Sequence, residues 1–448
     1  MESNRISGFG KIQGMIMENF GLGRNASLAI MTLVGILILF ACFWFFHSAP
    51  PKSLTITCGD KGSLYYSVAE RYAKILARDG VKLNILPSEG SVENLKRLAD
   101  PSFAVDIGFV QAGLAKGKNI DDLVSLGSVS YQPLMVFHRL PQAVERLSQL
   151  AGRRIAVGRE GSGTRLLSLT LLSVNGIEPG GTTVLLDLEG EKAAEALLKG
   201  ELDAVFLMAD SASSRTMRSL LQAQGIQLVN FTQADGYTRR IGYLNKLVIP
   251  RGAMDFGKNI PAQDVTLVSP TVELIARNDL HPALSDLLLA AAMDIHGRAA
   301  LFQNRGEFPA ALESEFKVSE DAKRFYKSGK SFFYRYLPFW LASFINRVLV
   351  VFVPLIIILI PGLKTIPALF QWRMKLRINR WYRLLLAVEQ EGKAQQAADR
   401  LAALARRIDE IESEVHRMKV PASYGDQVYL LRSNIDFVRS KLPEARPQ

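Results

Sequence analysis

The stretch of sequence that decides the fold is Arg154-Ile155-Ala156-Val157-Gly158-Arg159-Glu160-Gly161-Ser162-Gly163-Thr164-Arg165. Its apolar beginning, Arg154 to Val157, predicts a strand, and Gly158–Thr164 predicts a glycine-rich loop that opens a helix from Arg165 to Asn175. The same order of strand, loop and helix occurs earlier, with a strand at Ser53–Cys58 and a loop at Gly59–Ser63 before a helix from about Tyr65 to Ala77. The chain therefore contains two similar α/β halves.

Strands and helices continue to alternate within each half. In the first half we expect strands at Val81–Leu86 and Val105–Gln111, with a helix between them. In the second half we expect strands at Thr183–Leu186 and Ala204–Met208, with a helix at Glu191–Leu198. Such alternation favours a mainly parallel sheet in each half, and two such halves predict two lobes with a cleft between them.

Three loops are the candidate binding site: Gly59–Ser63, Ser88–Ser91 and Gly158–Thr164. Each follows a strand and opens a helix, which is where ligands of open α/β sheets bind and where helix N-termini favour anions. Glycine lets the backbone approach a ligand, and Ser or Thr hydroxyls add donors. For any one loop an ordinary helix N-cap is the better explanation, because Ser and Thr are common caps. Three such loops at corresponding strand ends favour a binding site.

Five motifs stand out at these strand ends and loops: Gly59–Tyr66, Glu89–Asn94, Val105–Gln111, Gly158–Arg165 and Gly200–Phe206. Together they resemble the TAXI family, the solute-binding subunits of TRAP transporters, over about residues 53–320, and Gly-Ser-Gly-Thr-Arg is the most specific piece. The resemblance implies a type II periplasmic-binding fold with two hinge strands, Ser128–Phe137 and Thr266–Ala276. It also implies that the lobes close around a small carboxylate solute, which is passed to TRAP permease membrane subunits.

The resemblance also assigns ligand contacts by motif position. They are Ser63, Tyr65, Ser88, Ser91, Asn94, Gln111, Gly161, Ser162, Gly163 and Thr164.

Three further residues are weaker candidates. Arg165 either reaches a carboxylate or pairs with a nearby acid; Tyr131 is either a contact or a structural hinge residue; and Asp210 is either a contact or the cap of the next helix. The charges of Asp60, Lys61 and Glu89 depart from the small residues usual in the family. They leave the solute, and the competence of the cleft to bind one, open.

Two apolar runs flank this domain. Residues 26–46 follow a leader at 1–25 and predict an uncleaved signal anchor; the alternative, a cleaved signal peptide, fits the length of the run and its Phe-Trp-Phe-Phe end less well. Residues 341–364 predict a second transmembrane helix, because a run this apolar on all sides is not amphipathic, although a buried core helix is the alternative.

The basic residues beside these runs predict the topology. Lys11 and Arg24 precede the first run, and a cluster follows the second: Arg373, Lys375, Arg377, Arg380 and Arg383. By the positive-inside rule both termini are cytoplasmic. The protein is then expected in the inner (cytoplasmic) membrane of a bacterium, with the domain at 50–335 in the periplasm or outside. Within this domain we expect one lobe at about 53–135 and 265–325 and the other at about 136–264.

The tail at 371–448 carries a heptad pattern. Apolar residues recur every three or four positions from Ala394 through Ala397 to Met418, and after a break at Pro421–Gly425 they resume from Val428 to Leu442. This predicts a coiled-coil hairpin or self-association through the first helix, and the two are compatible.

No motif indicates catalysis, a cofactor or nucleic-acid binding. The Gly161-Ser162-Gly163 run is not a nucleophile elbow, the loop lacks a P-loop lysine, and the five histidines have no metal-ligand spacing. The net charge of +11 is concentrated beside the membrane segments and not along a folded module. We therefore expect a binding protein for uptake. The alternatives are a sensor that signals to a partner through the second membrane helix and a scaffold that has lost its ligand.

Overall fold

The computed structural model describes residues 13–14, 24–312, 314–394, 398–418, 420 and 424–441. Most of the predicted leader, including Lys11, lies outside the described residues, as do Ala397 and Leu442 of the heptad pattern and residues 421–423 of its break. The chain divides into two compact units: Pro50–Ile345, and Met1–Ala49 together with Asn346–Gln448. Each unit is described by itself.

The first lobe of Pro50–Ile345 is built on a mixed sheet of order β10-β11-β3-β1-β2, with β4 also paired to β11. The outer strand β10 extends this sheet into the second lobe, because its Leu244 and Ile249 belong to the core of that lobe. The first three strands, β1, β2 and β3, are mutually parallel, as expected, whereas β11 runs antiparallel to β3. The sheet is therefore mixed and not mainly parallel. Its elements are β1 (Ser53–Cys58), α3 (Leu64–Arg78), β2 (Lys82–Pro87), α4 (Ser91–Ala99), β3 (Ile107–Gln111), β4 (Leu123–Tyr131), β10 (Leu244–Ile249), β11 (Val265–Arg277), α9 (Pro282–His296) and α10 (Glu320–Ser328).

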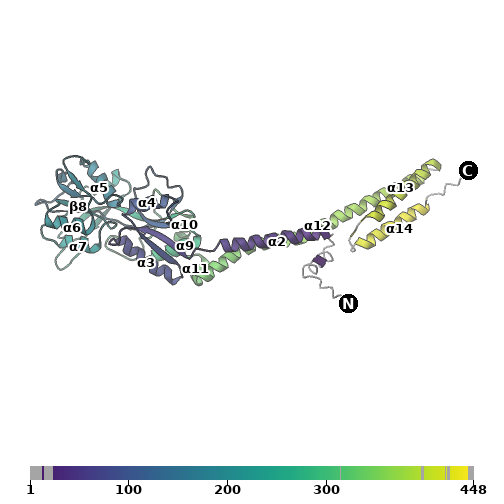
Figure 1. The fold of residues 1–448 in the computed structure, drawn as a ribbon, viewed down its shortest axis with the longest axis horizontal. Helices are drawn as coiled ribbons and strands as arrows, with labels where there is room; N and C mark the ends of the chain where they lie inside the picture. The colour runs from purple at the N-terminus through teal and green to yellow at the C-terminus, as the bar shows by residue number, and fades with distance from the viewer. Residues whose placement is uncertain are drawn as a thin grey trace. The chain divides into compact units, whose positions relative to one another are not determined.

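The second lobe has a smaller mixed sheet of order β7-β6-β8-β5-β9. Here β6 is parallel to β7 and β8, and β5 is antiparallel to β8. Figure 1 shows α5, α6 and α7 grouped around this sheet. Its elements are β5 (Met135–His138), the 3-10 turn η1 (Leu147–Leu150), β6 (Arg154–Ala156), α5 (Gly163–Val174), β7 (Val184–Leu186), α6 (Gly190–Lys199), β8 (Ala204–Leu207), α7 (Ser214–Gln222), β9 (Gln227–Leu228) and α8 (Ala234–Arg240).

Two segments cross between the lobes. The chain passes from β4 to β5 through residues 132–134, inside the predicted hinge Ser128–Phe137. The other predicted hinge lies within β11, which is one strand serving both lobes. Its first half pairs with β10 and contributes Leu267 to the core of the second lobe, whereas its second half pairs with β3 and contributes Leu274 to the core of the first.

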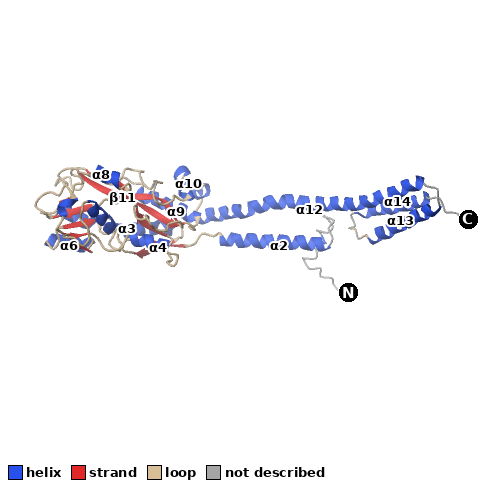
Figure 2. Cartoon of the chain, turned by 90° about the horizontal axis from the view of Figure 1, so that it is seen from above, coloured by secondary structure: helices blue, strands red, loops and turns tan. Residues whose placement is uncertain are grey.

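Two long apolar helices flank the domain. They are α2 (Arg24–His47) and α12 (Phe339–Ala394), drawn lengthwise in Figure 2. Within them Ser27–His47 and Phe339–Gly362 are long and apolar enough to span a membrane, by length and composition. The helix α12 contains the predicted transmembrane segment 341–364, passes through Pro354 and Pro361 without a break, and continues beyond the segment.

The tail is a bundle of three helices. As expected, α13 (Ala398–Arg417) and α14 (Gly425–Lys441) form a hairpin, and their apolar faces share one buried cluster. The sequence pattern missed the third partner, which is the last part of α12. It contributes Met374, Ile378, Leu385 and Val388 to the same cluster.

Candidate functional site

The predicted loops meet in a buried polar cluster between the lobes. Two of the predicted hydroxyls are helix caps. The Oγ of Ser63 accepts a hydrogen bond from the N–H of Tyr66 at 3.2 Å and caps α3, and the Oγ of Ser162 accepts one from the N–H of Arg165 at 3.1 Å and caps α5. Both side chains are buried. For these residues the N-cap interpretation accounts for the hydroxyl.

The second loop forms a network inside the first lobe. The amide of Asn94 donates to the carbonyl of Phe109 at 2.9 Å, and its Oδ1 accepts from Ser88 at 2.6 Å and Thr57 at 2.7 Å. These contacts tie the start of α4 to β1 and β3. By contrast, the Ser91 hydroxyl is fully buried with no hydrogen-bond partner among the described residues.

The first turn of α5 binds a carboxylate that belongs to the protein itself. The Oδ2 of Asp210 accepts a hydrogen bond from the N–H of Gly163 at 2.8 Å, and its Oδ1 accepts one from the Thr164 hydroxyl at 2.7 Å. Asp210 does not cap the following helix, because Ser213 caps α7. The side chain is 1% exposed, and burial raises the pKa of Asp210 although the hydrogen bonds from Thr164 and Gly163 oppose the shift.

Residues of the first lobe lie close to the carboxylate of Asp210. A Cβ on Gly90 would lie 3.1 Å from the Oδ2 of Asp210 and 3.1 Å from the Cα of Ser162, so only glycine fits there. The buried Oε1 of Gln111 has no hydrogen-bond partner among the described residues and lies against Gly163. The lobes are therefore in direct contact at this point.

Backbone hydrogen bonds also cross from lobe to lobe. The N–H of Glu93 donates to the carbonyl of Gly161 at 3.2 Å, and the N–H of Leu64 donates to the carbonyl of Ala209 at 3.2 Å. The polar cluster is thus closed, and the candidate contacts Gly161, Ser162, Gly163 and Thr164 face protein groups.

Arg159 is the partner of two of the charged residues noted in the sequence, Asp60 and Glu89. From the second lobe its guanidinium contacts the carboxylates of Glu89 at 2.8 Å and Asp60 at 3.4 Å, both in the first lobe. It also contacts Glu189 of its own lobe at 2.6 Å. Burial alone would lower the pKa of Arg159, but these three carboxylates raise it. Arg159, Glu89 and Asp60 thus form a set of ion pairs between the lobes, which we call the clasp.

The other two weaker candidates, Arg165 and Tyr131, also have partners within the protein. Arg165 pairs with Asp187 and donates to the carbonyl of Gly158 at 3.2 Å, so it turns toward its own lobe. The Tyr131 hydroxyl donates to Glu307 at 3.0 Å, and its ring lies against Phe308.

A cavity of about 510 Å³ opens between the lobes beside this cluster. Its walls come from α3 and the end of α9 in the first lobe, the crossing segment, and α7 in the second lobe. Most lining residues are apolar. They include Val68, Pro133, Met135, Met217, Leu221, Met254, Ile295 and Phe302. This volume lies within the range of small-molecule sites.

The charged residues that line the cavity all carry basic groups. Arg71, Arg218 and Arg298 are exposed at its rim, and none of the described residues that line it is Asp or Glu. Arg298 lies 3.8 Å from Asp294, whereas Arg71 and Arg218 form no ion pair with a described residue. The cavity therefore combines apolar walls with a positive rim.

Two buried polar side chains, His296 and Tyr65, also line the cavity. The Nε2 of His296 has no hydrogen-bond partner among the described residues, and burial, with the charge of Arg71, lowers the pKa of His296 to about 4. Burial and the charge of Asp210 raise the pKa of Tyr65, so its hydroxyl keeps its proton. Of the predicted contacts only Tyr65 and Tyr131 line the cavity. Arg71, Arg218 and His296 also line it and were not among the predicted contacts.

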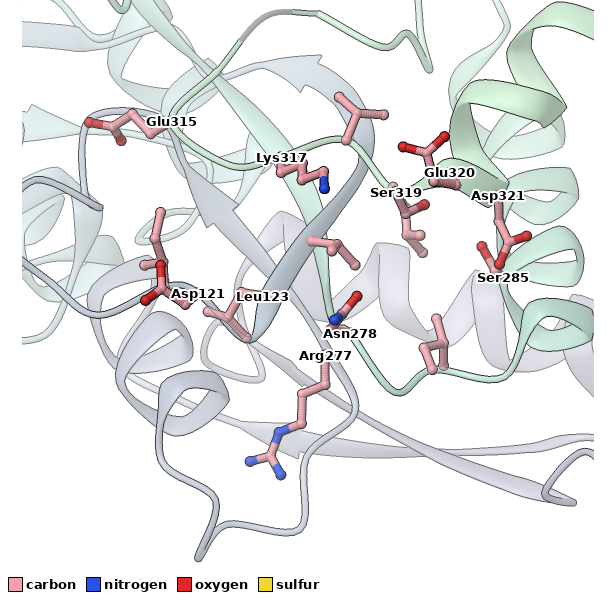
Figure 3. A pocket seen from close by; sticks show the side chains of 15 residues that line it. Asp121, Leu123, Arg277, Asn278, Ser285, Glu315, Lys317, Ser319, Glu320 and Asp321 are labelled. Atoms are coloured by element: carbon pink, nitrogen blue, oxygen red, sulfur yellow. The ribbon is translucent and has the colours of Figure 1, made fainter. Parts of the chain in front are cut away.

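A second cavity, of about 440 Å³, lies within the first lobe between the start of β4, the end of β11 and residues 315–321. Figure 3 shows Lys317 between the carboxylate of Glu315 on one side and those of Glu320 and Asp321 on the other. Because basic and acidic side chains both line it, this cavity favours neither an anionic nor a cationic ligand. Among the described residues no group of three His, Cys, Asp or Glu side chains is placed to hold a metal ion.

Comparison with known proteins gives a family and several structural likenesses. The model of the NMT1-like family matches residues 56–284. A structure of a protein from Bordetella bronchiseptica RB50 is 19% identical and covers 54% of this chain and 71% of its own, with a TM-score of 0.36. The periplasmic aliphatic sulphonate binding protein SsuA from Escherichia coli is 16% identical, with coverages of 55% and 73% and a TM-score of 0.35. An ancestral arginine-binding protein bound to arginine is 12% identical, with coverages of 55% and 92% and a TM-score of 0.36.

Proposed function

Since the chain belongs to the NMT1-like family and its two mixed sheets form the lobes of a type II periplasmic-binding fold, we propose that this solute-binding protein is anchored in a membrane and captures a small organic anion for uptake. The observation that carries the proposal is the cavity between the lobes, with apolar walls and a rim of arginines without carboxylates. A solute with an acidic group and an apolar part fits both features.

The mechanism is closure of the lobes around the solute. Arg71 lies on α3 of the first lobe and Arg218 on α7 of the second, so an anion between them attracts both lobes at once. The apolar part of the solute lies against residues such as Val68 and Met217, and the buried polar atoms of Tyr65 and His296 select its orientation. On opening, the clasp of Arg159 must break.

We therefore propose that the solute binds in the cavity and not at the three loops predicted from the sequence. The loop residues bring the lobes together and position the first turn of α5, and Tyr65 and Tyr131 are the two original candidates that we retain as solute contacts. A carboxylate is the first anion to test, because the resemblance to TRAP-linked binding subunits implies one.

Uptake requires a membrane permease as the partner of this chain. A TRAP-type permease in the same membrane would receive the solute, with residues 50–335 in the periplasm and both termini in the cytoplasm. A strain that lacks this chain should then lose uptake of the solute that the purified chain binds. Unchanged uptake would contradict the transport role, whereas binding of the solute by the purified chain is an independent measurement.

One observation favours a second function, sensing. The first residues of α12 are part of the first lobe: Phe339 lies in its buried core, and a Cβ on Gly80 would lie 2.8 Å from the indole Nε1 of Trp340. The same helix continues through the apolar span into the tail bundle. A receptor would use this continuous helix to transmit closure. Solute-dependent change in the spacing of spin labels on α13 and α14 would support sensing, and unchanged spacing would count against it.

A further inference from the structure

The carboxylate of Asp210 stands where a solute anion would be expected. It receives hydrogen bonds from the N–H of Gly163 and the hydroxyl of Thr164, the first two residues of α5. A helix N-terminus favours negative charge, and here that preference is met from within the chain. The position is filled by protein and not by solvent, because Asp210 is 1% exposed.

The first lobe completes the enclosure. Gly90 approaches the Oδ2 of Asp210 so closely that a Cβ would lie 3.1 Å from it, and a Cβ on Gly59 would lie 3.0 Å from the Asp210 carbonyl. The Oε1 of Gln111 is buried, has no hydrogen-bond partner among the described residues, and is aimed at the same turn of α5. A buried acceptor without a donor is costly, so the turn of α5 that holds Asp210 also faces an unpaired polar atom of the first lobe.

Asp210 is also next to the cavity. Ala209 and Ala212, on either side of it in the chain, both line the cavity, and Tyr65 lines it within reach of the charge of Asp210. An acidic group of a solute that extended from the cavity toward α5 would therefore meet a carboxylate already bound there. Two like charges at short range and without water between them repel each other strongly.

We propose that Asp210 is a specificity-determining residue: its carboxylate occupies the anion position at the N-terminus of α5, so the site accepts solutes with one anionic group and rejects those with two. The proposal rests on the proposed function for the solute, but the occupancy of the position by Asp210 stands on the geometry alone. In a chain without this carboxylate, the first turn of α5 is open to a free anion.

The first test is chemical rescue of Asp210→Ala in the full chain in detergent, with formate and acetate as probes and no other solute. The thermal midpoint of this variant should fall below that of the wild type and rise again with millimolar formate, and not with chloride at the same ionic strength. Asp203→Ala, which removes a carboxylate paired with Arg154 at the edge of the second lobe, should gain nothing from formate. An Asp210→Ala midpoint that formate does not change, or that equals the wild type, would overturn the proposal.

The second test is specificity, by titration calorimetry with a monocarboxylate and the dicarboxylate of the same carbon skeleton. Asp210→Ala should raise the affinity for the dicarboxylate relative to the monocarboxylate by at least about tenfold. Asp210→Asn keeps the shape and removes the charge, so it should also narrow the discrimination and serves if Asp210→Ala does not fold. Loss of monocarboxylate binding in Asp210→Asn would mean that Asp210 contacts the solute directly, which contradicts the proposal. Rescue by formate needs no solute, so its outcome is independent of whether the cavity binds carboxylates.

Discussion

The Nη1 of Arg159 in the second lobe lies 2.8 Å from the Oε2 of Glu89 in the first, and its Nη2 lies 3.4 Å from the Oδ2 of Asp60. Two carboxylates from one lobe thus converge on a single guanidinium of the other. All three side chains are more than one-third exposed, so each pair is screened by solvent and contributes about 0–1 kcal/mol. Contacts of this size can adjust the balance between open and closed lobes without locking it.

The first prediction concerns this clasp. Asp60→Asn combined with Glu89→Gln removes the ion pairs between the lobes and leaves the pair of Arg159 with Glu189. The ratio of closed to open molecules should fall by a few-fold, because about 1 kcal/mol is lost in total. Fluorescence transfer between labels on the two lobes measures this. The matched control is Asp187→Asn, which removes the partner of Arg165 inside one lobe. If the double variant and the control give the same transfer, the clasp has no part in closure.

The second prediction concerns the close approach at α5. In Gly163→Ala the new methyl group would contact the Oε1 of Gln111 in the first lobe and lie 3.0 Å from the Oδ2 of Asp210. The lobes should separate, although alanine itself is a better helix former by about 1 kcal/mol. Gly236→Ala in α8 has no atom within 4 Å of its new Cβ and is the control. Lobe separation is read by the same fluorescence transfer, and equal values for both variants would contradict the closed arrangement.

The third prediction is a pH dependence due to His296. Its pKa is lowered to about 4 in the folded protein, so the unfolded chain binds the proton first as the pH falls. Stability is therefore lost as the pH falls from about 6.5 toward 4, with a loss on the order of 2 kcal/mol between pH 7 and pH 5. Denaturant unfolding of the full chain should show a smaller loss for His296→Gln. The exposed His416→Gln should behave as the wild type, and an unchanged pH dependence in His296→Gln would show that His296 is not the cause.

The fourth prediction concerns the tail bundle. Leu431 is fully buried among α12, α13 and α14, whereas its neighbour Leu430 is 58% exposed. Leu431→Ala should destabilise the bundle by about 2–5 kcal/mol, and Leu430→Ala by much less. Limited proteolysis of the full chain should cut the tail of Leu431→Ala much faster. Equal cleavage of the two variants would argue against the three-helix packing.

Much of the fold could be predicted because its signals are local. The strand at Ser53–Cys58 is observed with the predicted bounds, and the glycine-rich loop after Val157 leads into α5 as expected. The antiparallel direction of β11 could not be derived from alternation, because its partner β3 lies far earlier in the sequence. A hinge strand at Thr266–Ala276 was expected only through the resemblance.

The site was harder to predict, because it depends on which elements become neighbours. Asp210 follows β8, and β8 pairs with β6 just before α5, so the carboxylate reaches Gly163 across 47 positions of sequence. No local sequence pattern predicts that contact. Arg71 and Arg218 are arginines on exposed helix faces in the sequence, and only the meeting of α3 and α7 makes them a rim.

The central claim is that the cavity between the lobes binds a small organic anion, and calorimetric titration of the full chain in detergent tests it most directly. The titrants are monocarboxylates of increasing apolar size. We predict saturable binding that Arg71→Ala and Arg218→Ala each weaken by about tenfold or more, whereas Arg215→Ala, on the same helix but outside the cavity lining, has no effect. No binding by any carboxylate, or binding that the two rim variants leave unchanged, would contradict the account.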